Sequence, residues 1–258
     1  MKLEKITEDR KRNKICFLLK DSNEVFANVV RRLIIEEVPT LAVEDVEIKE
    51  NSSALYDEML ALRLGLTPIK TDLKSYTLKE KCKCNGEGCA QCELKITLKG
   101  SKKGYVYAEE AQSTDPKCTF VYPKMPIVKL LAKQKVDVTL TAILGKGKMH
   151  AKWSPGWAFY KKEPSLNVGK VKNPEAIAAK CTDGVLVLKN KKLEVVSEKL
   201  YDSNLLEYYA SLDEGITVEY GDTIIFFLES WGQLGCKEIL SVSADILVEK
   251  VEDLEKQL

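Results

Sequence analysis

Residues 21–53 restrict the fold more than any other stretch, because they change from helical to extended periodicity within a few positions. Asp21, with Glu24 three residues later, predicts a capping box at the start of a helix. The apolar side chains from Val25 to Ile34 then recur at helical spacing. Val38-Pro39 predicts the helix end, because the residue before a proline is disfavoured in the α region. We therefore expect an amphipathic helix that leads directly into a strand.

The rest of the chain mixes alternating and helical patterns, which together predict an α+β protein. Residues 105–107 are expected to pair back on residues 94–99 as a hairpin. Residues 216–223 are expected to form a strand and a turn, before a buried strand at 224–230. Further strands are expected at 14–19, 41–48, 136–142, 185–188 and 193–196, and helices at 55–66, from 174, from 203 to about 211 and at 237–258.

The charge balance argues against a global attraction to nucleic acid. Forty basic and thirty-nine acidic residues leave a net charge of +1. No run approaches the roughly 18 apolar residues that a membrane-spanning helix needs. The charged amino terminus lacks the apolar core of a signal peptide. These features predict a cytoplasmic protein, in which eight cysteines serve as thiols or metal ligands rather than as disulfides.

Cys82, Cys84, Cys89 and Cys92 carry the clearest chemical signal, with the spacing C-x-C-x4-C-x2-C. Closely spaced cysteine pairs can each supply two corners of a tetrahedral zinc site. We expect one structural Zn²⁺; an iron–sulfur cluster, a redox pair and four free thiols are the alternatives. Four thiolates would fill the coordination shell of zinc, so no open position would remain for catalysis.

Other candidate catalytic residues have structural explanations. Asp57 and Glu58 are adjacent on a predicted helix and diverge by about 100°, so we expect surface charges rather than a catalytic pair. His150 is the only histidine, and no serine–carboxylate pair frames it. Residues 148–162 combine lysines with Trp153, Trp157, Phe159 and Tyr160 and could bind RNA. We expect instead that these aromatic side chains pack internally.

Several motifs occur together in an order that resembles one family. The motifs are Ala27-Asn28-Val29-Val30-Arg31-Arg32, Val38-Pro39, Asn51-Ser52-Ser53, Leu55-x-Asp57-Glu58-x-x-Ala61-x-Arg63-Leu64, Pro126-Ile127-Val128-x-Leu130 and Gly147-x-x-His150-x-Lys152-Trp153-x-Pro155. The chain resembles the α-like assembly subunits of cellular RNA polymerases. Among them it is most similar to the archaeal D-type subunits, the counterparts of the eukaryotic third-largest subunit and of the bacterial α N-terminal domain.

The resemblance implies a discontinuous architecture. A dimerisation domain would combine residues 1–48 with 214–258, and a β-rich domain at 49–164 would be inserted with its zinc loop at 82–92. Residues 165–213 correspond to the place where some archaeal D-type subunits carry a ferredoxin-like insert. Only Cys181 is present there, so we expect a degenerate module without an iron–sulfur cluster.

The resemblance also implies a function: a non-catalytic assembly platform of DNA-directed RNA polymerase. The chain would pair with the small L subunit, bind the small N and P subunits and anchor the large catalytic subunits, reaching DNA and RNA only through the complex. Nucleotidyltransferase activity would belong to that complex. The expected interface residues are Phe26, Asn28, Val29, Arg31, Arg32, Leu33, Leu240, Ser243, Leu247, Val251 and Leu254.

Two other classes of function remain open on the sequence. A stand-alone zinc-dependent nucleic-acid binder would need a basic face, which the net charge of +1 does not favour. An electron-transfer protein would need cluster ligands beyond Cys181.

Overall fold

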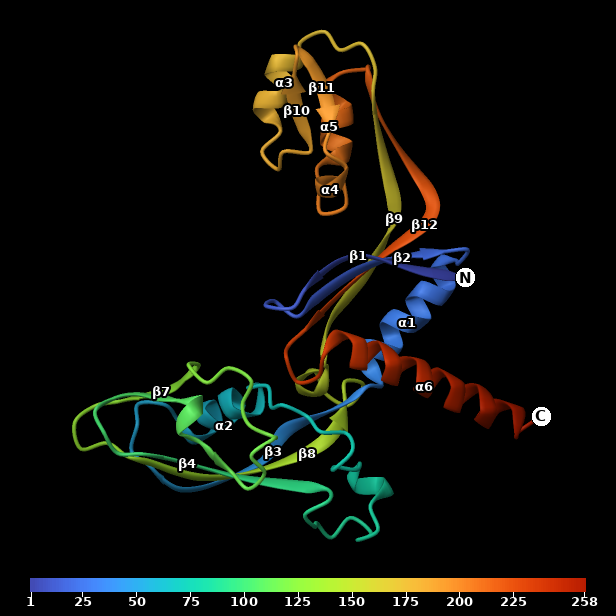
Figure 1. Cartoon of the computed structure of the whole chain (residues 1–258). Coiled ribbons are helices and arrows are strands. Elements are labelled where there is room, and N and C mark those ends of the chain that lie inside the picture. Colours follow the sequence, from blue (N-terminus) through green and yellow to red (C-terminus); the bar gives the residue numbers. More distant parts are fainter. The chain divides into compact units, whose positions relative to one another are not determined.

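The computed structural model describes the backbone of residues 1–258 and every side chain except that of Glu198. The chain is an α+β protein that divides into two compact units (Figure 1). The first unit comprises Met1–Thr7, Cys16–Asn28 and Phe159–Phe227. The second comprises Glu8–Ile15, Val29–Ala158 and Leu228–Leu258.

The helices and strands follow one another in mixed order along the chain. The helices are α1 (Glu24–Glu36), α2 (Asp57–Gly65), α3 (Pro174–Lys180), α4 (Ser197–Leu200), α5 (Leu206–Leu212) and α6 (Cys236–Glu255), with 3-10 turns η1 (Lys79–Lys81), η2 (Ala108–Glu110) and η3 (Ala151–Trp153). The strands are β1 (Lys2–Asp9), β2 (Lys14–Lys20), β3 (Pro39–Asn51), β4 (Glu93–Gly100), β5 (Gly104–Tyr107), β6 (Gln112–Ser113), β7 (Pro126–Leu130), β8 (Val136–Lys146), β9 (Gly156–Val168), β10 (Leu186–Lys189), β11 (Lys192–Val195) and β12 (Ile216–Ser230).

The predicted change from helix to strand is confirmed, since α1 ends at Glu36 and β3 begins at Pro39. The predicted cap is wrong. The side chain of Asn23, not Asp21, accepts a hydrogen bond from the backbone N–H of Phe26 at 2.8 Å. Asp21 has a φ of 54°, so it lies in the turn before the helix. Either residue type can cap a helix, and the position of the turn selects Asn23.

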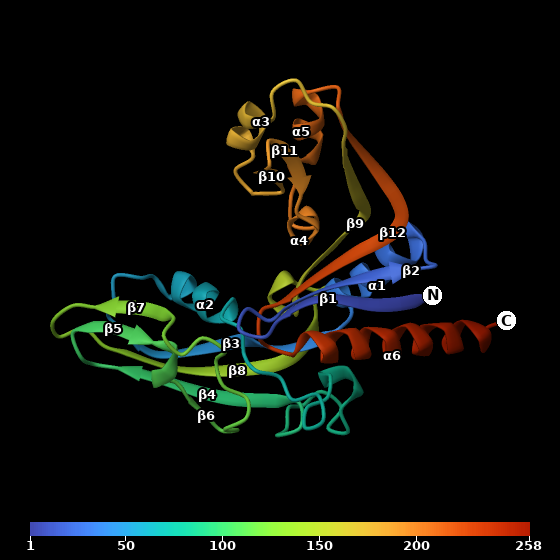
Figure 2. The same cartoon turned by 45° about the horizontal axis from the view of Figure 1, so that its top comes forward.

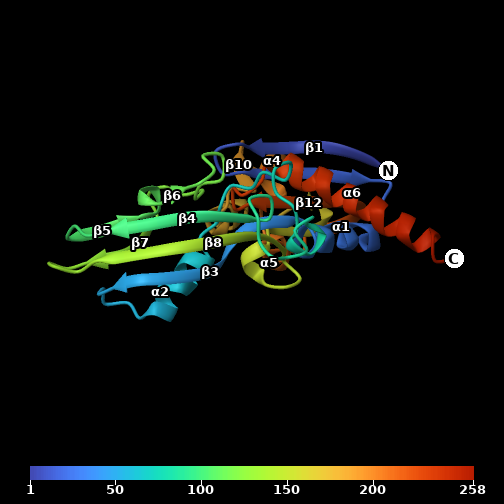
Figure 3. The same ribbon diagram turned by 90° about the horizontal axis from the view of Figure 1, so that it is seen from below.

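The main sheet of the second unit has the strand order β3-β8-β4-β6. Figure 3 shows β3, β8 and β4 side by side, and their pairing is antiparallel. Alternate side chains of these strands form one apolar core, to which Leu60 and Leu64 of α2 contribute fully buried side chains. At roughly 1.5–3 kcal/mol per buried aliphatic side chain, this core stabilises the unit that carries the cysteine loop.

The expected hairpin between residues 94–99 and 105–107 is wrong. Strand β5 pairs with β7, with Val106 opposite Val128 (Figure 2). One edge of β4 pairs with β8 along its whole length, and on the other edge the short strand β6 pairs with Ile96 and Thr97. The chain leaves the sheet through Gly104, whose φ of 138° is open to glycine but strained for other residues.

The other large sheet has the strand order β1-β2-β12-β9. The turn expected within residues 216–223 is wrong, because β12 continues through Gly221 to Ser230. Strand β12 lies between β2 and β9 in the sheet, and near Gly221 the hydroxyl of Ser165 in β9 donates to the carbonyl of Glu219 at 3.3 Å. Within the first unit, α3, α5 and the β10–β11 pair enclose a separate apolar core that includes the fully buried Tyr209.

Among the described residues, no helix combines the length and the apolar character needed to cross a membrane.

Candidate metal centre

The cysteine loop lies between η1 and β4 and folds back on itself through short turns. The backbone N–H of Asn85 donates to the carbonyl of Cys82 at 3.1 Å, and that of Cys92 donates to Cys89 at 3.0 Å. Gly86 and Gly88 have φ values of 85° and 99°, which glycine adopts without steric cost. These turns bring both cysteine pairs to the same point.

The four sulfur atoms form a compact group whose members all lie within 4.8 Å of one another. The Sγ of Cys82 is 3.5 Å from that of Cys89, and the Sγ of Cys92 is 3.6 Å from Cys84 and 3.8 Å from Cys89. A zinc tetrahedron with Zn–S bonds of about 2.3 Å has edges of about 3.8 Å, so the donor set fits one ion. In a [4Fe–4S] cluster each thiolate binds a different iron, which would hold the sulfurs further apart.

The surroundings of the loop shift the pKa values of two of its thiols in opposite directions, since burial raises the pKa of Cys92 to about 12. The backbone N–H of Cys84 is the main reason that the pKa of Cys82 falls to about 6, and the neighbouring thiols add to the effect. Cys82 and Cys92 are buried, whereas Cys84 and Cys89 are partly exposed. Glu93, next to Cys92, pairs with Lys79 at 2.9 Å, which ties the two ends of the loop together.

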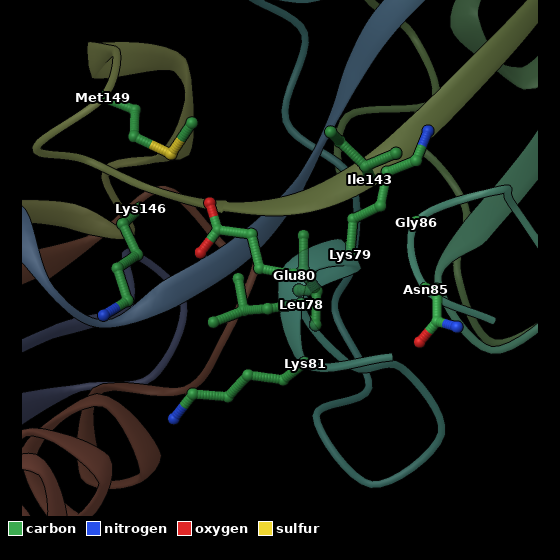
Figure 4. Close-up of a pocket in the computed structure, with 10 residues that line it drawn as sticks. Leu78, Lys79, Glu80, Lys81, Asn85, Gly86, Ile143, Lys146 and Met149 are labelled. Carbon is green, nitrogen blue, oxygen red and sulfur yellow. The ribbon is translucent and has the colours of Figure 1, made fainter. Parts of the chain in front are cut away.

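A pocket of about 850 Å³ lies beside this loop (Figure 4). Apolar side chains such as Leu78, Ile143 and Met149 line much of it. Three lysines also line it, and each is in an ion pair: Lys79 with Glu93, Lys81 with Glu249 at 3.3 Å, and Lys146 with Glu37 at 2.9 Å. Their charges are therefore already matched, and the pocket has little attraction left for an anion.

The expected interface residues of α1 differ in exposure. Leu33 is buried, Phe26, Asn28 and Arg31 are half-buried, and Val29 is 36% exposed. The exposed Arg32 forms an ion pair with Glu36, one turn later on the helix, at 3.2 Å.

The expected residues of α6 change from buried to exposed along the helix. Ser243 is buried and donates its hydroxyl to the carbonyl of Leu240 at 2.8 Å. Leu240 and Leu247 are half-buried, whereas Val251 and Leu254 are 49% and 58% exposed. The second half of α6 therefore presents apolar side chains that its own chain does not cover.

The remaining predicted positions have local structural roles. The side chain of Asn51 donates to the exposed Asp57 at 2.8 Å, and Glu58 is exposed. His150 caps η3, because its Nδ1 accepts from the N–H of Lys152 at 3.0 Å. The expectation that the aromatics of residues 148–162 all pack internally is wrong: Trp153 is buried, but Trp157 is 56% exposed. Strand alternation explains this, because Trp157 lies on the open face of β9.

The sequence did not reveal the buried polar group around Asp183. This carboxylate accepts hydrogen bonds from Ser203 at 2.5 Å, Tyr209 at 2.8 Å and Cys181 at 3.1 Å. Burial raises the pKa of Asp183, but these bonds outweigh it and lower the pKa to about 2. Cys181 is two residues from Asp183, but Ser203 and Tyr209 are 20 and 26 residues away in the sequence. No local motif therefore indicated the group.

These features define a class: an α+β protein with a compact four-thiol centre beside its main sheet and a long, partly uncovered terminal helix. Among the described side chains, the four cysteines are the one group of three or more potential metal ligands that lie close together.

Comparison with known proteins identifies the family. Residues 46–156 match the family described as the RNA polymerase Rpb3/RpoA insert domain. The chain is 33% identical to DNA-directed RNA polymerase subunit Rpo3 of Methanosarcina acetivorans, covering 92% of this chain and 91% of the relative. It is 34% identical to the Rpo3 subunit of Pyrococcus horikoshii, covering 98% and 95%. The chain belongs to the Rpo3 family of DNA-directed RNA polymerase subunits.

Proposed function

We propose that this chain is the non-catalytic assembly platform of a DNA-directed RNA polymerase. It pairs with a small L-type subunit, binds the small N and P subunits and anchors the two large catalytic subunits. Contact with DNA and RNA comes through the complex, and so does nucleotidyl transfer. This proposal rests on similarity to Rpo3 subunits over most of the chain.

The observation that carries the proposed pairing is the exposure of α6. Among the 20 residues of this helix, only Ile239 and Ser243 are buried. Val248, Val251 and Leu254 recur every three residues and are each about half exposed or more. An apolar stripe of this kind on a terminal helix is stabilised when a second helix covers it. The L-type subunit is the partner that we assign to it.

We assign one structural Zn²⁺ to Cys82, Cys84, Cys89 and Cys92. Three of the six sulfur–sulfur separations are 3.5–3.8 Å, close to the edge of a zinc–thiolate tetrahedron, and four protein ligands leave no open position. The ion would hold the loop between η1 and β4 in its folded form. Its contribution would be to folding, with no step of the polymerase reaction at this site.

The proposed domain arrangement follows the family. Residues 1–48 and 214–258 would form the dimerisation domain, residues 49–164 the insert, and residues 165–213 a degenerate ferredoxin-like module. The separate apolar core around Tyr209 supports a distinct module. In this module the thiol of Cys181 donates a hydrogen bond to the carboxylate of Asp183 and accepts one from the backbone N–H of Leu186, each at 3.1 Å. Hydrogen bonds therefore satisfy this thiol without a metal.

The experiment that tests the function is purification of the complex from the cells that make the chain, with a tag on its amino terminus. We expect recovery in one assembly with an L-type subunit, the N and P subunits and two large subunits that hold RNA polymerase activity. Recovery of the chain alone, or in a particle without the large subunits, would contradict the proposal.

A further inference from the structure

The far end of the insert concentrates positive charge to a degree that the whole chain does not. Residues 99–105 and 129–137 contain six lysines and a single acid, Asp137, and the neighbouring strand β3 adds Glu50 opposite Asp137, whereas the complete sequence has a net charge of +1. We call these two segments the lysine tip.

Strand pairing brings the two segments together. Gly100 of β4 is opposite Val136 of β8, and Gly104 of β5 is opposite Leu130 of β7. The turn that leaves β4 and the turn that enters β8 therefore lie at the same end of the unit (Figure 2). The cysteine loop joins β4 at its other end, about 26 Å away for eight residues at ~3.3 Å each. The lysine tip is thus separate from the candidate metal centre.

Two of the six lysines interact with a neighbouring side chain, and the other four are exposed to solvent. Lys99 pairs with Asp137 at 3.0 Å, and the Nζ of Lys129 lies 5.2 Å from the ring centre of Tyr105. Lys102, Lys103, Lys133 and Lys135 are exposed, and among the described residues no carboxylate lies within ion-pair distance of their side chains. Clustered like charges repel one another, so this arrangement costs stability until an anion neutralises it.

Apolar side chains lie among these charges. Leu131, between Leu130 and Ala132 in the second turn, is 53% exposed, and Tyr105 is 51% exposed. The buried centre of a protein interface combines apolar or aromatic anchors with a charged rim. The lysine tip has both parts: Leu131 as the anchor and the four free lysines as the rim.

We propose that the lysine tip binds an acidic protein segment that carries an apolar side chain. The carboxylates of the segment face Lys102, Lys103, Lys133 and Lys135, and its apolar side chain contacts Leu131. This surface goes beyond subunit assembly through α6, because it lies on the insert and uses different chemistry.

Nucleic acid is the competing ligand for a basic surface, and two observations disfavour it. Single-stranded nucleic acid is bound by stacking bases on free aromatic faces. Lys129 lies over the ring of Tyr105, and Tyr107 is tilted against it at 6.1 Å. Leu131 cannot contribute to phosphate binding, whereas the apolar side chain of an acidic peptide can pack against it.

The test measures binding of a fluorescein-labelled peptide made of Glu, Asp and Leu to the full-length chain, in the complex in which it is purified. The variant reverses Lys102, Lys103, Lys133 and Lys135 to Glu, and we expect it to weaken binding at low salt by about tenfold or more. The matched control reverses Lys170, Lys180, Lys191 and Lys192 to Glu, which makes the same change in net charge with exposed lysines of the first unit. We expect this control to bind the peptide almost as wild type.

Leu131→Ser separates the anchor from the charges, and we expect it to weaken binding of the peptide by about threefold or more. A peptide with Ser in place of Leu should bind the wild-type chain more weakly than the original peptide, by the same factor. Retained zinc in each variant shows that the insert is folded. Equal binding by the lysine-tip and control variants, or no binding by wild type, would overturn the proposal. So would tighter binding of a mixed-sequence oligonucleotide that depends on the four lysines and ignores Leu131.

Discussion

The Nζ of Lys250, on the exposed half of α6, lies 3.0 Å from the Oε1 of Glu37, just beyond the end of α1. The other carboxylate oxygen of Glu37 accepts from Lys146 at 2.9 Å. The side chain of Glu37 is only 13% exposed, so this carboxylate links α6 and β8 to the end of α1 within the second unit. Burial raises its pKa, and the bonds from Lys146 and Lys250 outweigh that effect and hold the pKa below 4.5.

Replacing Glu37 with Gln should destabilise the second unit by about 1 kcal/mol, since both ion pairs are partly exposed. Because the folded-state pKa of Glu37 is lowered, its contribution is complete above about 4.5 and is lost as pH falls below that value. Urea unfolding at neutral and acid pH checks this, with Glu58→Gln on the exposed face of α2 as the control. A difference between Glu37→Gln and wild type that grows in acid would contradict the assignment.

Asp183→Asn should loosen the module of residues 165–213. The amide nitrogen cannot accept the bonds that the carboxylate accepts, so we expect a cost of about 1–3 kcal/mol. The pKa of Asp183 is lowered from 3.8 to about 2, so its contribution is lost as pH falls between these values. Hydrogen exchange of the amides of α3 and α5 measures the effect, and Asp222→Asn is an exposed control. Unchanged protection in Asp183→Asn would show that the hydrogen bonds do not hold the core.

Gly147→Ala should be among the most damaging single-methyl changes in the chain. A Cβ at this position would lie 1.9 Å from the backbone carbonyl oxygen of Ile35, and the next N–H, of Lys148, donates to the carbonyl of Glu36 at 2.9 Å. The backbone must move to make room, which we expect to cost about 2–4 kcal/mol. Gly235→Ala is the matched control, because no atom lies within 4 Å of its added Cβ. Thermal unfolding of both variants measures the effect. Equal melting temperatures for Gly147→Ala and Gly235→Ala would contradict this close contact.

Elements with strong local signals were predictable from the sequence. The proline after Val38 ended α1, and the spacing of Cys82, Cys84, Cys89 and Cys92 identified four thiols that the fold brings together. These signals act over a few residues, where steric limits on the backbone leave few alternatives. The cap prediction failed because Asp21 and Asn23 have the same chemistry and only the turn geometry separates them.

Features that depend on distant residues were not predictable. Strand β5 pairs with β7, whereas β4 pairs with β8 and with the short strand β6, and all three of these partners lie later in the sequence. The buried Asp183 group likewise joins residues that share no local pattern. The lysine tip is visible in the composition of its two segments, but the strand register is needed to bring the segments together.

Loss of one cysteine should remove the metal. We expect one zinc per chain in the wild type and less than half that amount in Cys84→Ser, because three thiolates hold the ion more weakly than four. Cys118→Ser is the control, since this fully buried thiol lies outside the four-cysteine cluster. Elemental analysis of the purified chain measures zinc and iron together. Two or more iron atoms per chain, or equal zinc in both variants, would contradict the assignment.

If a second subunit covers the exposed apolar stripe of α6, the chain should co-purify with a tagged L-type subunit through that stripe. Val251→Asp with Leu254→Asp places two carboxylates in that stripe, while Val187→Asp adds a carboxylate to an exposed apolar position of β10. Because each buried aliphatic side chain is worth roughly 1.5–3 kcal/mol, we predict at least about a tenfold loss of heterodimer for the double variant. The Val187→Asp control should give wild-type recovery. Equal recovery of heterodimer from the double variant and wild type, with zinc retained in both, would show that the L-type subunit does not bind this stripe.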